Sequence, residues 1–437
     1  MTEIDLLIQA RWIIPVEPTG VYEYHSLALH EGRIVDLLPT HAAKTTYQAR
    51  QTVQLDEHVL IPGLINAHTH AAMSLLRGLA DDLPLMEWLT QHIWPAETAW
   101  VNPDFVRDGT ELAIAEMLRG GITCFNDMYF FPDVAARVAS QYGMRACIGL
   151  IMLDFPTAWA SSPEEYLRKG LEVRDAYLDD PLITTAFGPH APYTVSDGPL
   201  ENIRKYADEI DIQIQMHIHE TTDEVEQSLA LHKQRPLQRL QALGLISPRL
   251  QAVHMTQLTD EEITMIAAAG AHVIHCPESN LKLASGFCPV DKLLKAGVNV
   301  ALGTDGAASN NDLDLLGEMR SAAMLAKAVA KDATSLPASE ALRMATLNGA
   351  RALGLEEETG SLLPGKAADI TAVYLGGIES LPVYDPISQL VYATGRHQVT
   401  DVWVAGQQLL NNRVLTRMDE YAIGSKARAW GLKIAGR

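Results

Sequence analysis

Eight short apolar segments, separated by stretches with helical features, are the pattern that most constrains the fold. Two of the intervening stretches begin with capping signals, Ser162-Pro163-Glu164-Glu165 and Thr221-x-x-Glu224. Strands that alternate with helices over about 300 residues predict a parallel (β/α)8 TIM-like barrel. An open doubly wound sheet is the alternative, but no G-x-G-x-x-G follows the first segment. The predicted strands are Leu64–Ala67, Ile122–Asn126, Arg145–Leu150, Ile183–Phe187, Ile212–His217, Leu250–His254, His272–Cys276 and Asn299–Gly303.

The two ends of the chain have a different pattern, with short apolar runs and tight turns. Glu31-Gly32 predicts a hairpin turn near the start, and Ala405-Gly406 predicts a second one near the end. We expect the ends to pair into one small β-sandwich domain beside the barrel. The predicted division is residues 1–58 for the first part of this domain, 59–362 for the catalytic barrel, and 363–437 for the second part with a C-terminal helix.

Composition excludes several classes of function. The 437 residues are 47% hydrophobic and 20% charged, with a net charge of −20. This charge argues against binding to nucleic acid or to an anionic membrane. No apolar run reaches the ~18 residues of a spanning helix, and the N-terminus lacks the pattern of a signal peptide. The four cysteines form no CxxC pair. We therefore expect a cytoplasmic enzyme with a small-molecule substrate, and a homo-oligomer is compatible with the sequence.

Histidine and carboxylate side chains recur where the predicted strands end. In a parallel barrel these ends meet at one mouth, where catalytic residues lie. The apolar run Val59–Ile65 is predicted as one buried strand that leads to His68 and His70. In an extended chain residues i and i+2 point to the same side, which suits a zinc-type ion. The other strand ends carry His190, His217-Ile218-His219-Glu220, His254 and Thr304-Asp305-Gly306.

Each of these residues also has a structural interpretation. We favour His217 as a metal ligand and give His219 a structural role, because a turn after the strand would separate the two side chains. His254 could be a core histidine, and His190 lies between prolines that shape a rigid turn. His272 and His275 flank the seventh strand and are predicted to be structural. Asp305 directly follows the last barrel strand, which favours a ligand over an ordinary turn aspartate.

Several motifs together resemble the amidohydrolase superfamily. They are PGLINAHTH, MHIHE, VHMTQ, HCPESNLKLASG, GTDGAASNN and GSLLPGKAADI, and they extend over nearly the whole chain. Within the superfamily the sequence is most similar to the 5′-methylthioadenosine/S-adenosylhomocysteine deaminase branch. The resemblance implies one divalent ion, most often Zn²⁺, held by His68, His70, His217 and Asp305. The fourth strand has no lysine for carboxylation, so we expect a mononuclear centre.

The resemblance also implies the roles of the remaining site residues. Glu220 and His254 are expected beside the attacking water, with Glu220 delivering a proton to the N1 atom of an adenine ring. Asp305 is expected to accept the proton of the water, and His254 to hold the developing oxygen. The positions that match Trp88, Glu97 and His190 contact the nucleoside, and Glu97 is expected to bind the ribose hydroxyls. The alternative is that Trp88 is a core residue and Glu97 a solvated charge.

Three functions compete on this basis. The first is a hydrolytic deaminase that converts the 6-amino group of an adenine nucleoside to the inosine analogue and ammonia. The second is an amidohydrolase of the same fold that acts on guanine, a pterin or a triazine. The third is a non-catalytic barrel, which the intact ligand set argues against. Residues 146–167 contain no lysine or arginine, so 5′-methylthioadenosine is the predicted better substrate and S-adenosylhomocysteine the weaker one.

Overall fold

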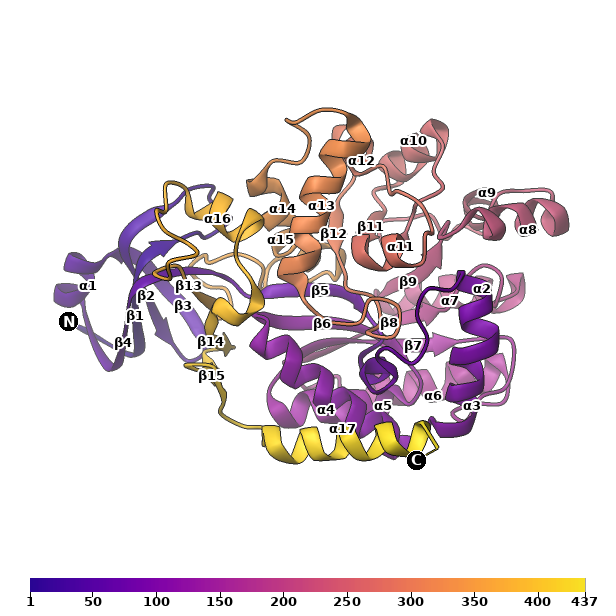
Figure 1. The fold of residues 1–437 in the computed structure, drawn as a ribbon, viewed down its shortest axis with the longest axis horizontal. Coiled ribbons are helices and arrows are strands. Elements are labelled where there is room, and N and C mark those ends of the chain that lie inside the picture. Colours follow the sequence, from indigo (N-terminus) through magenta and orange to yellow (C-terminus); the bar gives the residue numbers. More distant parts are fainter. Residues whose placement is uncertain (437) are drawn as a thin grey trace.

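The computed structural model describes residues 1–436 and consists of a barrel with a smaller β domain at one side (Figure 1). The barrel sheet has the strand order β12-β11-β10-β9-β8-β7-β6-β5, and every pair of neighbours in it is parallel. β12 lies beside β5, and beyond its end the Asp305 N–H donates to the His68 carbonyl oxygen at 3.1 Å. The sheet is thereby closed. The strands are β5 (Leu64–Thr69), β6 (Ile122–Tyr129), β7 (Arg145–Met152), β8 (Ile183–Pro189), β9 (Gln213–Ile218), β10 (Leu250–His254), β11 (His272–His275) and β12 (Val300–Leu302).

Helices between the strands cover the outside of the barrel (Figure 1). The predicted caps are present, since the Ser162 and Thr221 hydroxyls accept the N–H groups of Glu165 and Glu224. The predicted (β/α)8 barrel is therefore confirmed. Its helices include α4 (Pro103–Arg119), α5 (Pro132–Tyr142), α6 (Pro163–Ala176), α7 (Asp197–Ile210), α8 (Thr222–His232), α9 (Pro236–Ala242), α10 (Asp260–Ala269), α11 (Pro277–Lys282), α12 (Val290–Lys295), α13 (Leu315–Ala330), α14 (Ala338–Met344) and α15 (Leu347–Ala352).

The β domain is built from both ends of the chain, as predicted. The decisive contact is the antiparallel pairing of β4 with β13, which joins the N-terminal strands to the C-terminal ones. In the first hairpin turn Glu31 and Gly32 have φ values of 49° and 77°. This is the left-handed conformation of a tight hairpin turn. The sheet contains β1 (Thr2–Ile13), β2 (Tyr22–His30), β3 (Arg33–Pro39), β4 (Tyr47–Pro62), β13 (Ile370–Tyr374), β14 (Val399–Val404), β15 (Gln407–Asn411) and β16 (Val414–Leu415).

The apolar run Val59–Ile65 is not one strand, contrary to the prediction. Val59–Pro62 is the end of β4 in the β domain, and β5 of the barrel begins at Leu64. Gly63 separates them, and a Cβ atom there would lie 2.0 Å from the Thr123 hydroxyl oxygen. The close approach of the backbone to Thr123 allows the chain to pass from one sheet to the other. The boundaries 58/59 and 362/363 remain a prediction.

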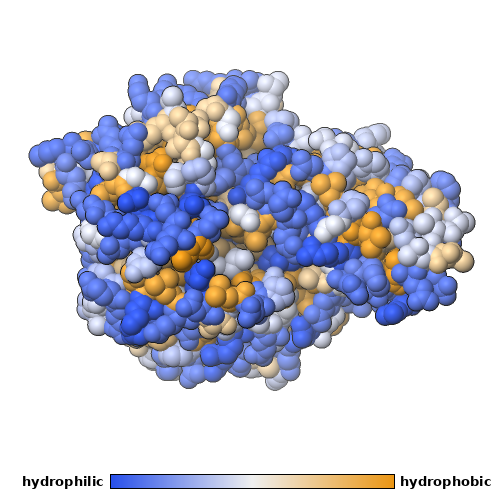
Figure 2. Space-filling model, turned by 180° about the vertical axis from the view of Figure 1, so that it is seen from behind, coloured by the Kyte–Doolittle hydropathy of each residue, from blue (hydrophilic) through white to orange (hydrophobic). Residues whose placement is uncertain are grey.

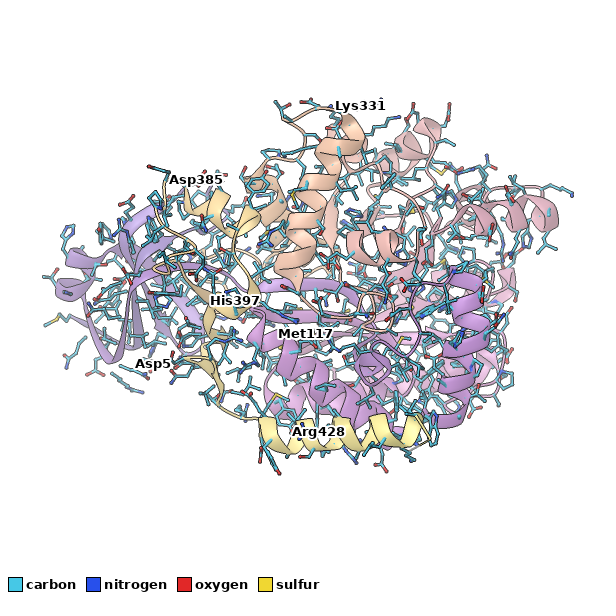
Figure 3. The ribbon with its side chains drawn as sticks, in the orientation of Figure 1. Asp5, Met117, Lys331, Asp385, His397 and Arg428 are labelled. Carbon is cyan, nitrogen blue, oxygen red and sulfur yellow. The ribbon has the colours of Figure 1, made fainter. Side chains whose placement is uncertain are left out.

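The C-terminal helix α17 (Glu420–Ile434) lies along α4 of the barrel (Figure 1). The Trp430 indole N–H donates to Asp108 at 3.0 Å, and the Lys426 ammonium contacts Glu111 at 2.7 Å. Figure 3 labels Arg428 on α17 and Met117 on α4. The chain thus leaves the β domain and returns to the barrel.

The apolar residues lie mostly inside the molecule. The face opposite to that of Figure 1 is largely hydrophilic, with apolar residues in separate groups (Figure 2). The four cysteines are buried and free. Within residues 1–436 no helix is both long and apolar enough to span a membrane.

Candidate metal centre and active site

Four side chains from three different places in the barrel meet at its mouth. His68 lies in β5, one residue before the strand ends at Thr69, and His70 follows the strand; His217 lies in β9, and Asp305 follows β12. One ligand atom from each lies within 4.8 Å of the others. The Asp305 Oδ1 atom is 3.1 Å from His70 Nε2 and 3.6 Å from His68 Nε2. The structure therefore brings together all four residues predicted as metal ligands.

The hydrogen bonds of the three imidazoles orient them for metal binding. Each ring places Nδ1 against an oxygen acceptor: His68 against Gln215 Oε1 at 3.2 Å, His70 against the Met128 carbonyl at 2.5 Å, and His217 against the His190 carbonyl at 2.7 Å. Nδ1 must then carry the proton, which leaves the Nε2 lone pairs free.

These free Nε2 atoms converge on one point. His68 Nε2 and His217 Nε2 are 3.1 Å apart, and tetrahedral zinc with ordinary bond lengths holds two nitrogens roughly 3.3 Å apart. Burial lowers the pKa of His68 to about 4 and that of His217 well below its usual value, so these two rings are neutral. Burial also acts to lower the pKa of His70, but Asp305 outweighs it and raises that pKa to about 9, so this ring must release its Nε2 proton when an ion binds. The donor set fits one divalent ion of the zinc type.

Asp305 is held by two hydroxyl groups. Its Oδ2 atom accepts from Ser279 at 2.7 Å and from Ser309 at 2.9 Å, while Oδ1 points to the histidines. Burial alone would raise the pKa of Asp305, but His68 and His70 hold it well below its usual range. The side chain is therefore an ionised carboxylate with one oxygen directed to the ligand group.

Glu220 and His254 lie beside this group. Burial, followed by the charge of Asp305, raises the pKa of Glu220 to about 8. His254 Nδ1 is 2.8 Å from Asn280 Oδ1, and His254 Nε2 is 3.8 Å from the Glu220 carboxyl group. A carboxyl group that keeps its proton at neutral pH beside an ionised one is suited to act as a general acid.

The turn after β9 directs Glu220 and His219 to opposite sides. The carboxyl group of Glu224 accepts the backbone N–H groups of His219 at 2.9 Å and Glu220 at 2.8 Å. His219 has a φ of 54° and faces Glu262 and α9. It lies outside the group of four ligands, in agreement with the structural role predicted for it.

A cavity of about 500 Å³ opens in front of the ligand group. His70, His217, Glu220, His254 and Asp305 line its inner end, and apolar side chains line much of the remainder. One wall is the segment that follows β5 and contains α2 (Leu85–Trp88), the π-helical turn η2 (Leu89–Ile93) and α3 (Trp94–Trp100).

The four residues predicted to contact substrate, Trp88, Glu97, His190 and Glu220, all line this cavity. Trp88 belongs to the wall segment. Glu97 accepts the hydroxyl of Tyr129 at 2.8 Å, and burial raises the pKa of its carboxyl group to about 7. His190 Nδ1 is 3.0 Å from the Thr194 hydroxyl. Glu97 is thus a half-buried group that lines the cavity and bonds Tyr129, and not a freely solvated charge.

Several residues of the site were missed in the sequence. Ser279, Ser309 and Asn280 hold Asp305 and His254, and Tyr129 holds Glu97. Gln215 holds His68. A usable signal was present for Gln215, because a polar residue two positions before a strand-end histidine points to the same side as that histidine. The serines lie on loops and a short helix, where spacing gives no direction.

Comparison with known proteins identifies the relatives of this fold and site. Residues 59–409 match the amidohydrolase family.

The chain belongs to the amidohydrolase family.

A relative named 5-methylthioadenosine/S-adenosylhomocysteine deaminase, from Teredinibacter turnerae, is 51% identical over 437 residues, which cover 100% of this chain and 99% of the relative. The crystal structure of an adenosine deaminase from Xanthomonas campestris with bound zinc has a TM-score of 0.99 and 55% identity, with 100% of both chains covered. The zinc-bound atrazine chlorohydrolase TrzN from Arthrobacter aurescens has a TM-score of 0.90 but only 25% identity, with 97% and 99% of the two chains covered.

These likenesses confirm the predicted superfamily and fold class. As a member of this amidohydrolase family with relatives named as deaminases, the chain is a hydrolase that acts on carbon–nitrogen bonds. A triazine hydrolase is a distant neighbour by comparison.

Proposed function

We propose that this amidohydrolase is a metal-dependent deaminase of adenine nucleosides, with 5′-methylthioadenosine as its preferred substrate. The water oxygen replaces the 6-amino group, and the products are the inosine analogue and ammonia. The observation that carries the proposal is the arrangement of the cavity, in which three members of the ligand group, Glu220 and half-buried Glu97 line a single space. The 51% identity over the whole chain to a relative with this name supports it.

His68, His70, His217 and Asp305 would hold one divalent ion, for which we propose Zn²⁺. When bound, such an ion lowers the pKa of a water molecule to ~7 and so supplies a nucleophile at neutral pH. The donor set supports this assignment, and so does the zinc in the similar structure from Xanthomonas campestris. β8, Ile183–Pro189, has no lysine, which supports a mononuclear centre.

The remaining groups of the mouth move protons. Glu220, with a pKa raised to about 8, holds a proton that it can deliver to N1 of the adenine ring as the water attacks C6. Ionised Asp305 accepts the proton of the water, and the His254 ring faces the developing oxygen. One of these two carboxyl groups, that of Glu220 or Asp305, then protonates the departing ammonia. One site can perform both roles because the pKa values of its two carboxyl groups are far apart.

The outer part of the cavity would bind the sugar and the 5′ substituent. Glu97 can accept two adjacent ribose hydroxyls, Trp88 provides an aromatic surface for the nucleoside, and His190 lies near the ring. Leu153, Phe155 and Pro156 line the cavity where the 5′ substituent would extend. Among the described residues 1–436, no lysine or arginine lines this space. A methylthio group suits such a surface, whereas a homocysteine carboxylate would have no cationic partner.

Ammonia release from a panel of substrates tests the class of reaction. The zinc-loaded enzyme is expected to act on 5′-methylthioadenosine, S-adenosylhomocysteine and adenosine, and not on guanine, a pterin or a chlorinated triazine. The Glu220→Gln variant, which retains the ligand group, serves as the background control. Turnover of a free base or triazine with no turnover of the nucleosides would contradict the proposed function.

A second measurement tests the preference within the nucleosides. One missing charge-assisted contact is worth about 1.5–3 kcal/mol, which corresponds to roughly ten- to a hundredfold. We therefore expect kcat/KM for 5′-methylthioadenosine to exceed that for S-adenosylhomocysteine by this factor. Equal values, or a preference for S-adenosylhomocysteine, would contradict the assignment of the apolar wall.

A further inference from the structure

Three amide side chains form a buried network inside the barrel, below the ligand group. They are Asn126 of β6, Gln215 of β9 and Gln251 of β10, and each has 0% of its surface exposed. Amides in such a position must satisfy their donors and acceptors within the protein. Their hydrogen bonds therefore reveal which way each amide points.

A backbone carbonyl fixes the orientation of each amide independently. Gln251 Nε2 donates to the Ala352 carbonyl at 2.7 Å, Asn126 Nδ2 donates to the Ala67 carbonyl at 2.9 Å, and Gln215 Nε2 donates to the Asp127 carbonyl at 2.8 Å. A carbonyl oxygen can only accept. The nitrogen and oxygen of every amide are thereby assigned by their surroundings.

The network then runs in one direction toward the ligand group. Asn126 Nδ2 also donates to Gln251 Oε1 at 2.7 Å, and Gln215 Nε2 also donates to Asn126 Oδ1 at 3.0 Å. The free acceptor at the end of this chain is Gln215 Oε1, which lies 3.2 Å from His68 Nδ1. An acceptor at this place requires the proton of His68 on Nδ1, and so leaves Nε2 as a lone pair.

His68 differs in this respect from the other two histidine ligands. The Nδ1 atoms of His70 and His217 face backbone carbonyls of Met128 and His190, which no substitution removes. Among the described residues, Gln215 is the only side chain that orients the Nδ1–H of a histidine in the ligand group. The space for Gln215 is also tightly defined, because a Cβ atom on Gly149 would lie 2.6 Å from its Nε2 atom.

We propose that Gln215 is a positioning residue that fixes the tautomer and ring orientation of His68, and thereby sets the affinity of the site for its divalent ion. This inference rests on the proposed metal centre and is independent of the identity of the nucleoside. Partners of this kind, which hold the second nitrogen of a metal-bound histidine, typically contribute ~10- to 100-fold to metal affinity.

The test is a zinc dissociation constant measured by competition with a chromophoric chelator, with no substrate present. Gln215→Leu removes the acceptor and is expected to weaken zinc binding by ~10- to 100-fold. Gln215→Glu keeps an oxygen acceptor but loses both donated hydrogen bonds. Its melting temperature is expected to fall, while its zinc affinity stays within about threefold of the wild type or becomes tighter.

Gln398→Leu is the matched control for the loss of a buried amide. Gln398 is 4% exposed and donates to the Tyr374 carbonyl and the Ser380 hydroxyl in the β domain, away from the ligand group. Its loss is expected to lower the melting temperature and leave zinc affinity unchanged.

Unchanged affinity in Gln215→Leu would overturn the proposal. If this variant does not fold, Gln215→Glu decides, because a loss of more than tenfold in affinity would overturn the proposal as well. A wild-type protein that binds no zinc would instead overturn the metal centre itself. A wild-type protein that binds zinc normally but has no deaminase activity would contradict only the proposed function.

Discussion

Both ends of the barrel bury ionisable side chains, but the hydrogen bonding of these side chains differs between the two ends. At the end nearest the β domain, Arg145 of β7 donates to Asp369 through Nε at 2.8 Å and Nη2 at 3.3 Å. Asp369 also accepts the N–H of Ala405 at 2.7 Å. At the mouth, the carboxyl group of buried Glu220 has no hydrogen-bond partner within the described chain, and His254 Nε2 is 3.8 Å away.

This difference distinguishes a charged group with a structural role, Arg145, from an ionisable group to which we assign a chemical role, Glu220. Burial opposes the charge of Arg145, but Asp369 outweighs this effect and holds its pKa above the usual value. The Arg145 guanidinium keeps its charge, and its hydrogen bonds to Asp369 link the barrel to the β domain. Glu220, in contrast, has a pKa raised to about 8 by burial, so it can take up and release a proton near neutral pH. We propose that incomplete pairing at the mouth makes this group available for catalysis.

Breaking the Arg145–Asp369 pair, at the end of the barrel nearest the β domain, is expected to have the largest effect on stability. Arg145→Met leaves Asp369 buried without its partner, which costs about 3–5 kcal/mol of unfolding free energy. The remaining folded enzyme should keep its zinc content and its kcat. Chemical denaturation and zinc analysis measure the two quantities. A normal unfolding free energy together with reduced kcat would reverse the roles assigned to the two ends.

Removing the acidic proton of Glu220 is expected to lower activity and to leave stability nearly unchanged. Glu220→Gln should lower kcat by at least ~10²-fold, a typical contribution of general acid–base catalysis, with little change in melting temperature or zinc content. Glu111→Gln is the control, because Glu111 is a buried carboxylate that bonds Lys426 and Tyr142 outside the cavity. Near-normal turnover of Glu220→Gln with a bound ion would show that the proton comes from another group.

A smaller effect on activity is expected for Glu97, which bonds the Tyr129 hydroxyl and lies in the outer part of the cavity. Glu97→Gln removes the charge and should lower kcat/KM for 5′-methylthioadenosine roughly tenfold, as expected for a hydrogen bond to a charged group. A 2′,3′-dideoxy analogue provides the control, because it has no hydroxyls for Glu97 to bind. An equal loss with the analogue would contradict the ribose contact.

The same Glu97→Gln variant makes a prediction for stability. The folded-state pKa of Glu97 is about 7, above the ordinary value of 4.5. The protonated form is therefore favoured in the fold, and this stabilisation is complete below pH 4.5 and is lost as the pH rises through 7. Melting temperatures should show a variant that is more stable than the wild type at pH 8, with the difference declining as the pH falls toward 4.5. A difference of opposite sign would contradict the raised pKa of Glu97 in the folded protein.

The sequence predicted the barrel and the ligand group because both depend on local patterns. Strand-end positions place His68, His217 and Asp305 at one mouth whatever the details of packing. Packing contacts between residues far apart in the sequence could not be predicted in the same way. The division of Val59–Ile65 depends on the contact of Gly63 with Thr123, and the docking of α17 depends on pairs such as Trp430 with Asp108. The partners of Asp305 lie on loops, where residue spacing does not determine direction.

A zinc titration of metal-free enzyme tests the central claim most directly, that a single ion at the His68/His70/His217/Asp305 group supports deamination. Zinc is added in steps up to two equivalents per chain, and ammonia release from 5′-methylthioadenosine is measured at each step. We expect activity to be absent without metal, to rise in proportion to zinc, and to stop rising at one equivalent. Full activity in the stripped enzyme, or a plateau only at two equivalents, would contradict the account.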